Sequence, residues 1–435
     1  MLATLGFGMV LVFMYLIMSR RLLPVVALVV VPIVFGLAAG IDAGALGRMM
    51  LDGLRTIAPT GVMLMFAILY FGVMIDAGLF DPVVRRVLRA VHGDPLRVVV
   101  GTALLALFVS LDGDGSTTYM ITVAAMLPLY RRLGIDALGL TCVTMLASSV
   151  MNLTPWGGPL ARAATALHLE PTAIFVPLLP TILAGAVAVA GFAWLIGSRE
   201  RARLGVLAWD EASASTTATR PGAAPELRRP GRLAFNALLT GVLMVALVAG
   251  VLPLPVLFMV GFSIALVANY PSLAAQRERI AAHAPNVLAV VSVIFAAGIF
   301  TGILNGSGMV EAMSRSFLAL LPPALGPYLA PITALASLPF TFFMSNDAFY
   351  FGVLPVVADA AQAYGIAPLE MARASLIGQP VHFLSPLVPS TYLLVGLAGV
   401  DFGDHQRFTL KWAVVTCLLM LLTGLATAAF PLAGS

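Results

Sequence analysis

The chain has 435 residues, of which 60% are hydrophobic and only 10% charged, and its mean hydropathy is +1.01. Soluble domains carry about a quarter charged residues, so this composition excludes a water-soluble globular protein. The net charge of +4 does not indicate nucleic-acid binding, because the arginines lie in loops between apolar segments, as in multi-pass membrane proteins.

Ten apolar segments predict helices that cross the bilayer, for which about 20 residues are needed. In chain order we expect spans at 2–18, 22–40, 57–79, 137–168, 171–196, 233–251, 254–270, 284–304, 366–398 and 408–431. Two further apolar regions, 97–131 and 326–361, are interrupted by polar residues and leave arms of roughly 13 to 17 residues, which are short for a crossing. We expect both to be re-entrant hairpins. The predicted fold class is an all-α polytopic membrane protein.

The positions of the basic residues predict the orientation. Nineteen of the 24 Lys and Arg fall on one side of this layout, and such an excess marks the cytoplasmic side. Both termini are then expected outside a bacterial-type inner (cell) membrane. The polar stretch 198–232, rich in Ser, Thr, Gly and Pro, is expected to be a flexible cytoplasmic linker between the parts 1–197 and 233–435.

The two parts resemble each other. Gly72 recurs as Gly302, 230 residues later, and Pro155 recurs as Pro386, 231 residues later. A Gly-Ile pair that begins at Gly134 recurs with the same offset of 231. Each part has five spans and one hairpin, and because five is odd, the second part must enter the membrane inverted. Inverted repeats with interrupted helices are typical of secondary transporters, which bind substrate near the midplane between the repeats.

Polar residues gather at four places inside the apolar segments, where they are costly and therefore indicate function. Two are the hairpin tips, and two are breaks in the fourth span of each part. Proline removes a backbone donor and glycine loosens a helix, so both breaks free backbone groups to meet a ligand. The candidate substrate-binding residues are Asp112, Asp114, Ser116 and Thr117 (first tip), Asn152, Thr154, Gly157, Gly158 and Arg162 (first break), Ser345, Asn346 and Asp347 (second tip), and His382, Ser385, Ser390 and Thr391 (second break).

The hairpin tips suit both anions and cations. The arm that begins at a tip presents backbone amides that attract an anion, and the arm that ends there presents carbonyls that suit a cation. Asp112, Asp114 and Asp347 would repel a polycarboxylate unless a cation lay between them, and hard divalent ions take oxygen ligands. We therefore expect these three carboxylates to contact a metal ion that arrives as part of the substrate.

Each candidate also has a plain structural interpretation. Asn346 and Asp347 could cap a helix. Arg162 could extend its charge to the membrane interface, and His382 could be a hydrogen-bonded core histidine.

Three segments, Asp112–Tyr119, Pro155–Ala163 and Gln379–Ser390, resemble the citrate–divalent-metal:proton symporter (CitMHS) family, and the resemblance covers nearly the whole chain. It implies a member of the ion-transporter superfamily, with a scaffold and a mobile transport domain that move as an elevator within a homodimer. The implied activity is symport of protons with citrate complexed to a divalent ion such as Mg²⁺ or Ca²⁺, without a tightly bound cofactor.

Three other functions are open at this stage. A proton- or sodium-coupled carrier of a metal-free di- or tricarboxylate is the alternative within transport. An intramembrane enzyme could use two carboxylates or His382 as acid and base, although the duplicated hairpins argue against it. A channel is the third, and saturable, proton-dependent uptake would distinguish a carrier from it.

Overall fold

A computed structural model of the chain describes residues 1–19, 21–91, 93–206 and 225–434. Throughout these ranges the regular elements are helices, and no strand occurs in them. By length and composition, seven of the described helices could cross a membrane. The chain is therefore an all-helical, multi-pass membrane protein, as predicted.

The described helices fall into two parts, one on each side of the linker. The first part contains α1 (Leu2–Met18), α2 (Pro24–Ala38), α3 (Ala43–Asp76), α4 (Asp81–Ala90), α5 (Pro95–Val109), the 3-10 turn η1 (Ser110–Asp112), α6 (Gly115–Leu133), α7 (Ala137–Met151), α8 (Gly158–Leu167) and α9 (Pro171–Leu204). The second contains η2 (Pro225–Leu227), η3 (Pro230–Arg232), α11 (Leu233–Val248), α12 (Leu254–Asn269), α13 (Leu273–Gly306), α14 (Met309–Leu320), η4 (Pro323–Tyr328), α15 (Leu329–Phe343), the π-helical turn η5 (Ala348–Val353), α16 (Leu354–Gln362), α17 (Pro368–Ser375), α18 (Gln379–His382), α19 (Pro389–Ala398) and α20 (Phe402–Ala426).

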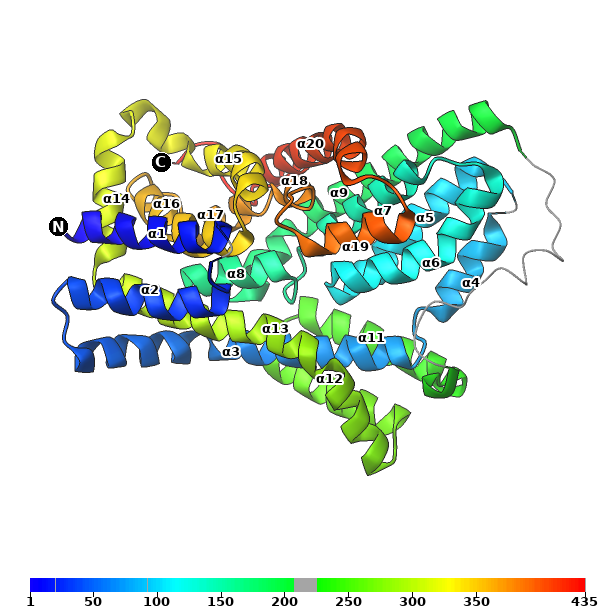
Figure 1. Ribbon diagram of the computed structural model, residues 1–435, viewed down its shortest axis with the longest axis horizontal. Helices are drawn as coiled ribbons and strands as arrows, with labels where there is room; N and C mark the ends of the chain where they lie inside the picture. Colours follow the sequence, from blue (N-terminus) through cyan, green and yellow to red (C-terminus); the bar gives the residue numbers. More distant parts are fainter. Residues whose placement is uncertain (20, 92, 207–224, 435) are drawn as a thin grey trace.

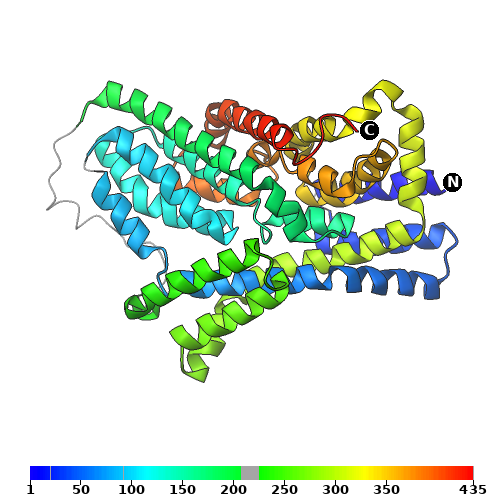
Figure 2. The same cartoon turned by 180° about the vertical axis from the view of Figure 1, so that it is seen from behind.

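Two helices of 34 residues, α3 and α13, run side by side along the long axis of the molecule, and the hairpins and breaks lie together on one side of them (Figures 1 and 2). The spans predicted at 57–79 and 284–304 therefore begin too late. Asp42 and Ser272 cap the true N-termini by accepting hydrogen bonds from backbone amides in the first turn. Charged residues follow near these N-terminal ends (Arg48 and Asp52 in α3, Arg277 and Glu278 in α13), so hydropathy alone does not reveal where the helices start.

Glycines allow α3 and α13 to approach closely. A Cβ at Gly53 would overlap the carbonyl oxygen of Gly298, and one at Gly302 would overlap the carbonyl oxygen of Met49. Without a hydrophobic driving force between helices in lipid, such small residues permit the close packing that holds membrane helices together. The close packing of this helix pair therefore depends on glycine at positions 53 and 302.

Both predicted hairpin regions form pairs of helices around a polar tip. The first arms are Pro95–Asp112, with 18 residues, and Pro323–Phe343, with 21 residues, when their 3-10 turns are included. These arms are longer than the sequence layout assumed. Arm length therefore no longer separates a re-entrant hairpin from two crossings, and the re-entrant interpretation stays a prediction.

Both predicted breaks are present. The span predicted at 137–168 is divided into α7 and α8 by residues 152–157. The span predicted at 366–398 is divided more extensively than expected, because α17 ends at Ser375, α18 has only four residues and α19 begins at Pro389. The second break is thus a long irregular segment with a short helix inside it.

Two elements differ from the sequence layout. Helices α4 and α14 were not predicted, because they are short and amphipathic and carry no apolar stretch of spanning length. Helix α9 continues to Leu204, where Arg203 pairs with Glu200 at 2.5 Å, so the linker predicted at 198–232 begins later than expected. Residues 207–224 of that linker lie outside the described residues.

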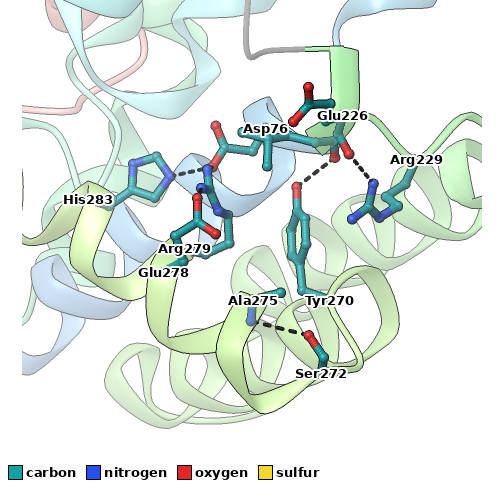
Figure 3. A network of polar contacts seen from close by, with 10 residues as sticks. Asp76, Glu226, Arg229, Tyr270, Ser272, Ala275, Glu278, Arg279 and His283 are labelled. Atoms are coloured by element: carbon teal, nitrogen blue, oxygen red, sulfur yellow. Dashed lines mark hydrogen bonds and ion pairs between the residues drawn. The ribbon is translucent and has the colours of Figure 1, made fainter.

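The end of the linker is fastened to the long helices by a polar network (Figure 3). Asp76 accepts a hydrogen bond from Arg279 at 3.1 Å, and its carboxylate is 2.8 Å from Nε2 of His283. Arg229 donates its backbone amide to Ala77 and its guanidinium to the last carbonyl of α12. Asp76 is thus buried and joins the end of α3 to the start of α13.

We expect Gly53→Ala to destabilise the protein by about 1–3 kcal/mol, because the added methyl group forces α3 and α13 apart. Thermal unfolding of the purified protein in detergent measures this. Gly47→Ala is the matched control, since a Cβ on Gly47 meets no atom within 4 Å. Equal melting temperatures for the two variants would show that close approach at Gly53 is not required.

Candidate substrate site

The first hairpin tip is a tight turn between η1 and α6. Gly113 has a φ of 79°, a left-handed conformation that glycine adopts without strain. The buried Asp112 carboxylate accepts a hydrogen bond from the backbone amide of Asp114 at 2.9 Å. The Asp114 carboxylate caps α6, because it accepts from the amides of Ser116 and Thr117, both at 3.1 Å, and from the Thr117 hydroxyl at 2.7 Å. Both carboxylates are fixed by the turn that carries them.

The first break is closed by its own residues and bound to the first tip. The Asn152 side-chain oxygen accepts a hydrogen bond from the Gly158 amide at 3.3 Å. A Cβ at Gly157 would overlap the Asn152 carbonyl oxygen, so only glycine fits there. The Trp156 indole donates to the Leu111 carbonyl at 3.1 Å. Trp156 therefore satisfies a carbonyl at the end of the first arm of the hairpin.

The second break binds the first arm of the second hairpin in the same manner. His382 Nδ1 is 2.6 Å from the Thr341 carbonyl oxygen, and because a carbonyl only accepts, Nδ1 carries the proton. The Ser385 hydroxyl donates to the Phe342 carbonyl at 2.6 Å. The carbonyls at the ends of both first arms, expected to suit a cation, are thus partly occupied by side-chain donors from the breaks.

The remaining candidates of the breaks have different surroundings. The Thr154 hydroxyl is buried and makes no hydrogen bond within the described structure. The Thr391 hydroxyl donates to the Phe383 carbonyl at 2.6 Å and so closes the second break. The Ser390 hydroxyl lies 3.5 Å from the position of a Cβ on Gly115, at the start of α6. The first tip therefore contacts both breaks.

The second tip carries the strongest ionic contact of the site. Asp347 accepts a hydrogen bond from Arg162 Nε at 2.6 Å, with the two side chains only 12% and 19% exposed. Arg162 also donates to the Gly158 carbonyl at 3.1 Å. Arg162 thus points into the protein, and the interpretation in which it extends to the membrane interface is wrong. Ser345 rather than Asp347 caps the turn that follows the tip, since its hydroxyl accepts from the Ala348 amide at 3.2 Å.

Sequence reasoning missed Gln379 and Tyr350. Gln379 is fully buried, and its Nε2 donates to the Asn346 side chain at 3.2 Å and to the Tyr350 hydroxyl at 3.0 Å. The Tyr350 hydroxyl in turn faces the Ser375 carbonyl at 3.4 Å. Gln379 therefore holds the second tip against the second break. The signal that could have found it is a fully buried amide next to a proline within the Gln379–Ser390 motif.

The three candidate carboxylates do not meet. Asp347 is neutralised by Arg162, while Asp114 caps α6 and Asp112 binds the turn. Among the residues that the structure describes, no group of three His, Cys, Asp or Glu side chains is placed to hold a metal ion. In this structure each of the three carboxylates has a partner of its own, and their contact with a metal ion that arrives with the substrate stays a prediction.

The sequence over this architecture matches a known family. Residues 13–378 match the profile of CitMHS, described as citrate transporter. The chain belongs to this family. It is 59% identical to the citrate transporter of Bacillus subtilis (strain 168) over 425 residues, which is 98% of each chain. It is 53% identical to the Mg(2+)/citrate complex secondary transporter of the same organism over 422 residues, 97% of each chain. The family resemblance of the three motifs is confirmed.

The fold resembles that of a solved membrane transporter. The chain superimposes on the YdaH transporter of Alcanivorax borkumensis with a TM-score of 0.57 at 15% identity, covering 90% of this chain and 91% of the other. At that identity the likeness concerns the fold alone. Because this is a family of transporters, the intramembrane enzyme considered from the sequence is excluded.

We expect Asp347→Asn to destabilise the protein by about 3–5 kcal/mol, because it leaves the buried Arg162 charge without a counter-ion. The melting temperature in detergent measures this. Asp52→Asn is the control, because Asp52 pairs with Arg55 at the surface, where both side chains are 69% exposed and such pairs contribute about 0–1 kcal/mol. Equal effects of the two substitutions would contradict a buried ion pair at the site.

Proposed function

We propose that this citrate transporter family member is a secondary active transporter that carries protons together with citrate complexed to a divalent ion of the Mg²⁺ or Ca²⁺ type. The metal is cargo and not a resident cofactor. In the proposal the four polar segments form one site, reached from either side of the membrane in turn. A relative with that kind of substrate in its name, the Mg(2+)/citrate complex secondary transporter, supports it.

The charge of the site is the observation that carries the proposal. Arg162 is the one cation among the candidate residues, and Asp347 already neutralises it. Asp112 and Asp114 then leave the site negative. Citrate near neutral pH is mostly a trianion, and like charges about 4 Å apart repel by several kcal/mol even at an effective dielectric constant of about 20. A divalent ion bound to citrate leaves one negative charge, which co-transported protons can offset.

The helix termini favour this reduced charge. Helices α6, α8 and α19 all begin at the candidate site, at Gly115, Gly158 and Pro389. The N-terminal end of a helix carries a partial positive charge and attracts anions. Together three such ends supply roughly 1.5 positive charges, which can balance the single negative charge of the complex but not the three of free citrate.

We extend the proposal to the architecture. Two inverted repeats within 1–197 and 233–435 would place α3 opposite α13 and α8 opposite α19. The members of each pair have equal lengths and begin 230 and 231 residues apart, which supports this. The proposed protein is a homodimer that moves as an elevator, with both termini outside and 198–232 in the cytoplasm, since most arginines lie on that side.

The alternative is a proton- or sodium-coupled carrier of a metal-free di- or tricarboxylate. The described residues contain no cluster of three metal-ligating side chains, which is compatible with a metal held by citrate or with none. The requirement for a divalent ion therefore decides between the two.

We expect labelled citrate to enter proteoliposomes only with a divalent ion, and labelled metal to enter only with citrate, because the site repels the free trianion. Each ion is supplied in turn, and protein-free liposomes are the blank. Uptake in EDTA at the full rate would contradict the metal complex and favour the metal-free carrier.

A further inference from the structure

Several buried polar atoms on α6, α7 and α20 have no hydrogen bond, and α7 packs against both other helices, outside the candidate substrate site. In the described structure they include the hydroxyls of Tyr119, Thr122 and Thr144 and the Nε2 atom of His405. Buried polar groups are normally paired, because burial without a partner is costly. The ionisable group among them is His405, and ionisable groups inside membrane proteins often mark a path for ions or protons.

A row of hydroxyls on α7 joins this region to the first hairpin tip. Thr141, Thr144 and Ser148 are spaced three and four residues apart, so they lie on one face of the helix and span about 10 Å. At one end, the Thr141 hydroxyl is 3.0 Å from Nδ1 of His405. At the other, the Ser148 hydroxyl is 3.4 Å from the position of a Cβ on Gly115, the first residue of α6. Hydroxyls both donate and accept, which is what relaying a proton requires.

His405 is the imidazole in this row, a side chain that can take up and release a proton. It is fully buried one turn into α20, and its Nδ1 is also 3.3 Å from the Thr409 hydroxyl. The side of the membrane where α20 begins is the arginine-rich side that we propose as cytoplasmic.

Other titratable groups near His405 are less suited to carry a proton. On the helices that pack against α20 they are Cys142 (α7), His382 (α18), Tyr392 (α19) and Arg199, Glu200, Arg201 and Arg203 (α9), and α20 itself carries Asp404, Arg407, Lys411 and Cys417. Thiols and phenols titrate well above neutral pH. His382 is committed to the Thr341 carbonyl, and Glu200 is paired with Arg203. Asp404 is half exposed and belongs to the surface.

We propose that His405 carries the co-transported proton and that Thr141, Thr144 and Ser148 connect its ring to the first hairpin tip. The neutral imidazole accepts one proton and becomes imidazolium, and it later gives one proton up on the cytoplasmic side. No other bond changes. This inference rests on the proposed function, because it assigns a residue to the proton coupling of that function.

Two assays on full-length protein in proteoliposomes test the inference. The first is exchange of labelled citrate, with Mg²⁺ present and equal pH on both sides, which needs no net proton movement. The second is accumulation driven by a pH gradient, with an internal dye recording proton entry. We expect His405→Gln to keep exchange and to lose accumulation by about tenfold or more, the range of ordinary coupling energies. Thr144→Val keeps the shape of the side chain but removes its hydroxyl. It should also keep exchange, and it should lose less accumulation than His405→Gln.

His168→Gln is the matched control, since His168 ends α8 and contacts Asn305 away from this row. It should leave both assays unchanged. Accumulation and proton entry equal to the unsubstituted protein in His405→Gln would overturn the inference alone. If His405→Gln does not fold, unchanged accumulation in Thr144→Val overturns it. In the unsubstituted protein, citrate exchange in the first assay together with no proton entry in the second would instead overturn the proton coupling of the proposed function, and this inference with it.

Discussion

The structure depends on one constraint, which is that the bilayer interior offers no water to backbone groups left unpaired where a helix is interrupted. This chain interrupts its helices in four places, and the interruptions satisfy one another. Trp156 from the first break binds the Leu111 carbonyl of the first hairpin, while His382 and Ser385 from the second break bind carbonyls of the second hairpin. Neither a tip nor a break would be stable alone. Folding therefore requires the tips and breaks to lie close together, independently of any role in binding.

This constraint explains what could be read from the sequence. Polar residues, prolines and glycines inside apolar segments are conspicuous, and they located both tips and both breaks. The pairing of Arg162 with Asp347 was not predictable, because the residues are 185 positions apart and no local pattern links them. The early starts of α3 and α13 were missed because charged residues such as Asp52 and Arg277 interrupt the apolar pattern near their N-terminal ends, so their length shows only when capping is considered. Hydropathy finds the lipid-facing part of a helix and not its ends.

The pairing of Arg162 also determines how charge is distributed in the site. An arginine without a counter-ion in the protein would favour binding of a free polycarboxylate. Because Arg162 is already paired, the negative charge of the substrate has to be neutralised by an ion that the substrate brings with it. The Asp114 carboxylate, committed to capping α6, is likewise held in place by its own helix. A site of this kind selects against bare anions by repulsion, which is a form of specificity that needs no added contact. In the proposed function, the metal is the component that removes this repulsion.

Helix α7 offers a physical basis for coupling the two cargoes. Its C-terminal end is Asn152, whose side chain closes the first break, and one turn earlier Ser148 lies against the first tip. The hydroxyl row that leads to His405 is on the same helix. A movement at the substrate site can therefore reach the proposed proton site through α7 alone. A helix of 15 residues moves largely as one body, and any shift that substrate imposes at the break reaches the row. Linkage is reciprocal, so in the proposed mechanism a proton on His405 raises the affinity for the citrate complex by the same factor by which that complex raises the affinity for the proton. A carrier that follows this proposal binds both cargoes together because each stabilises the helix position that the other prefers.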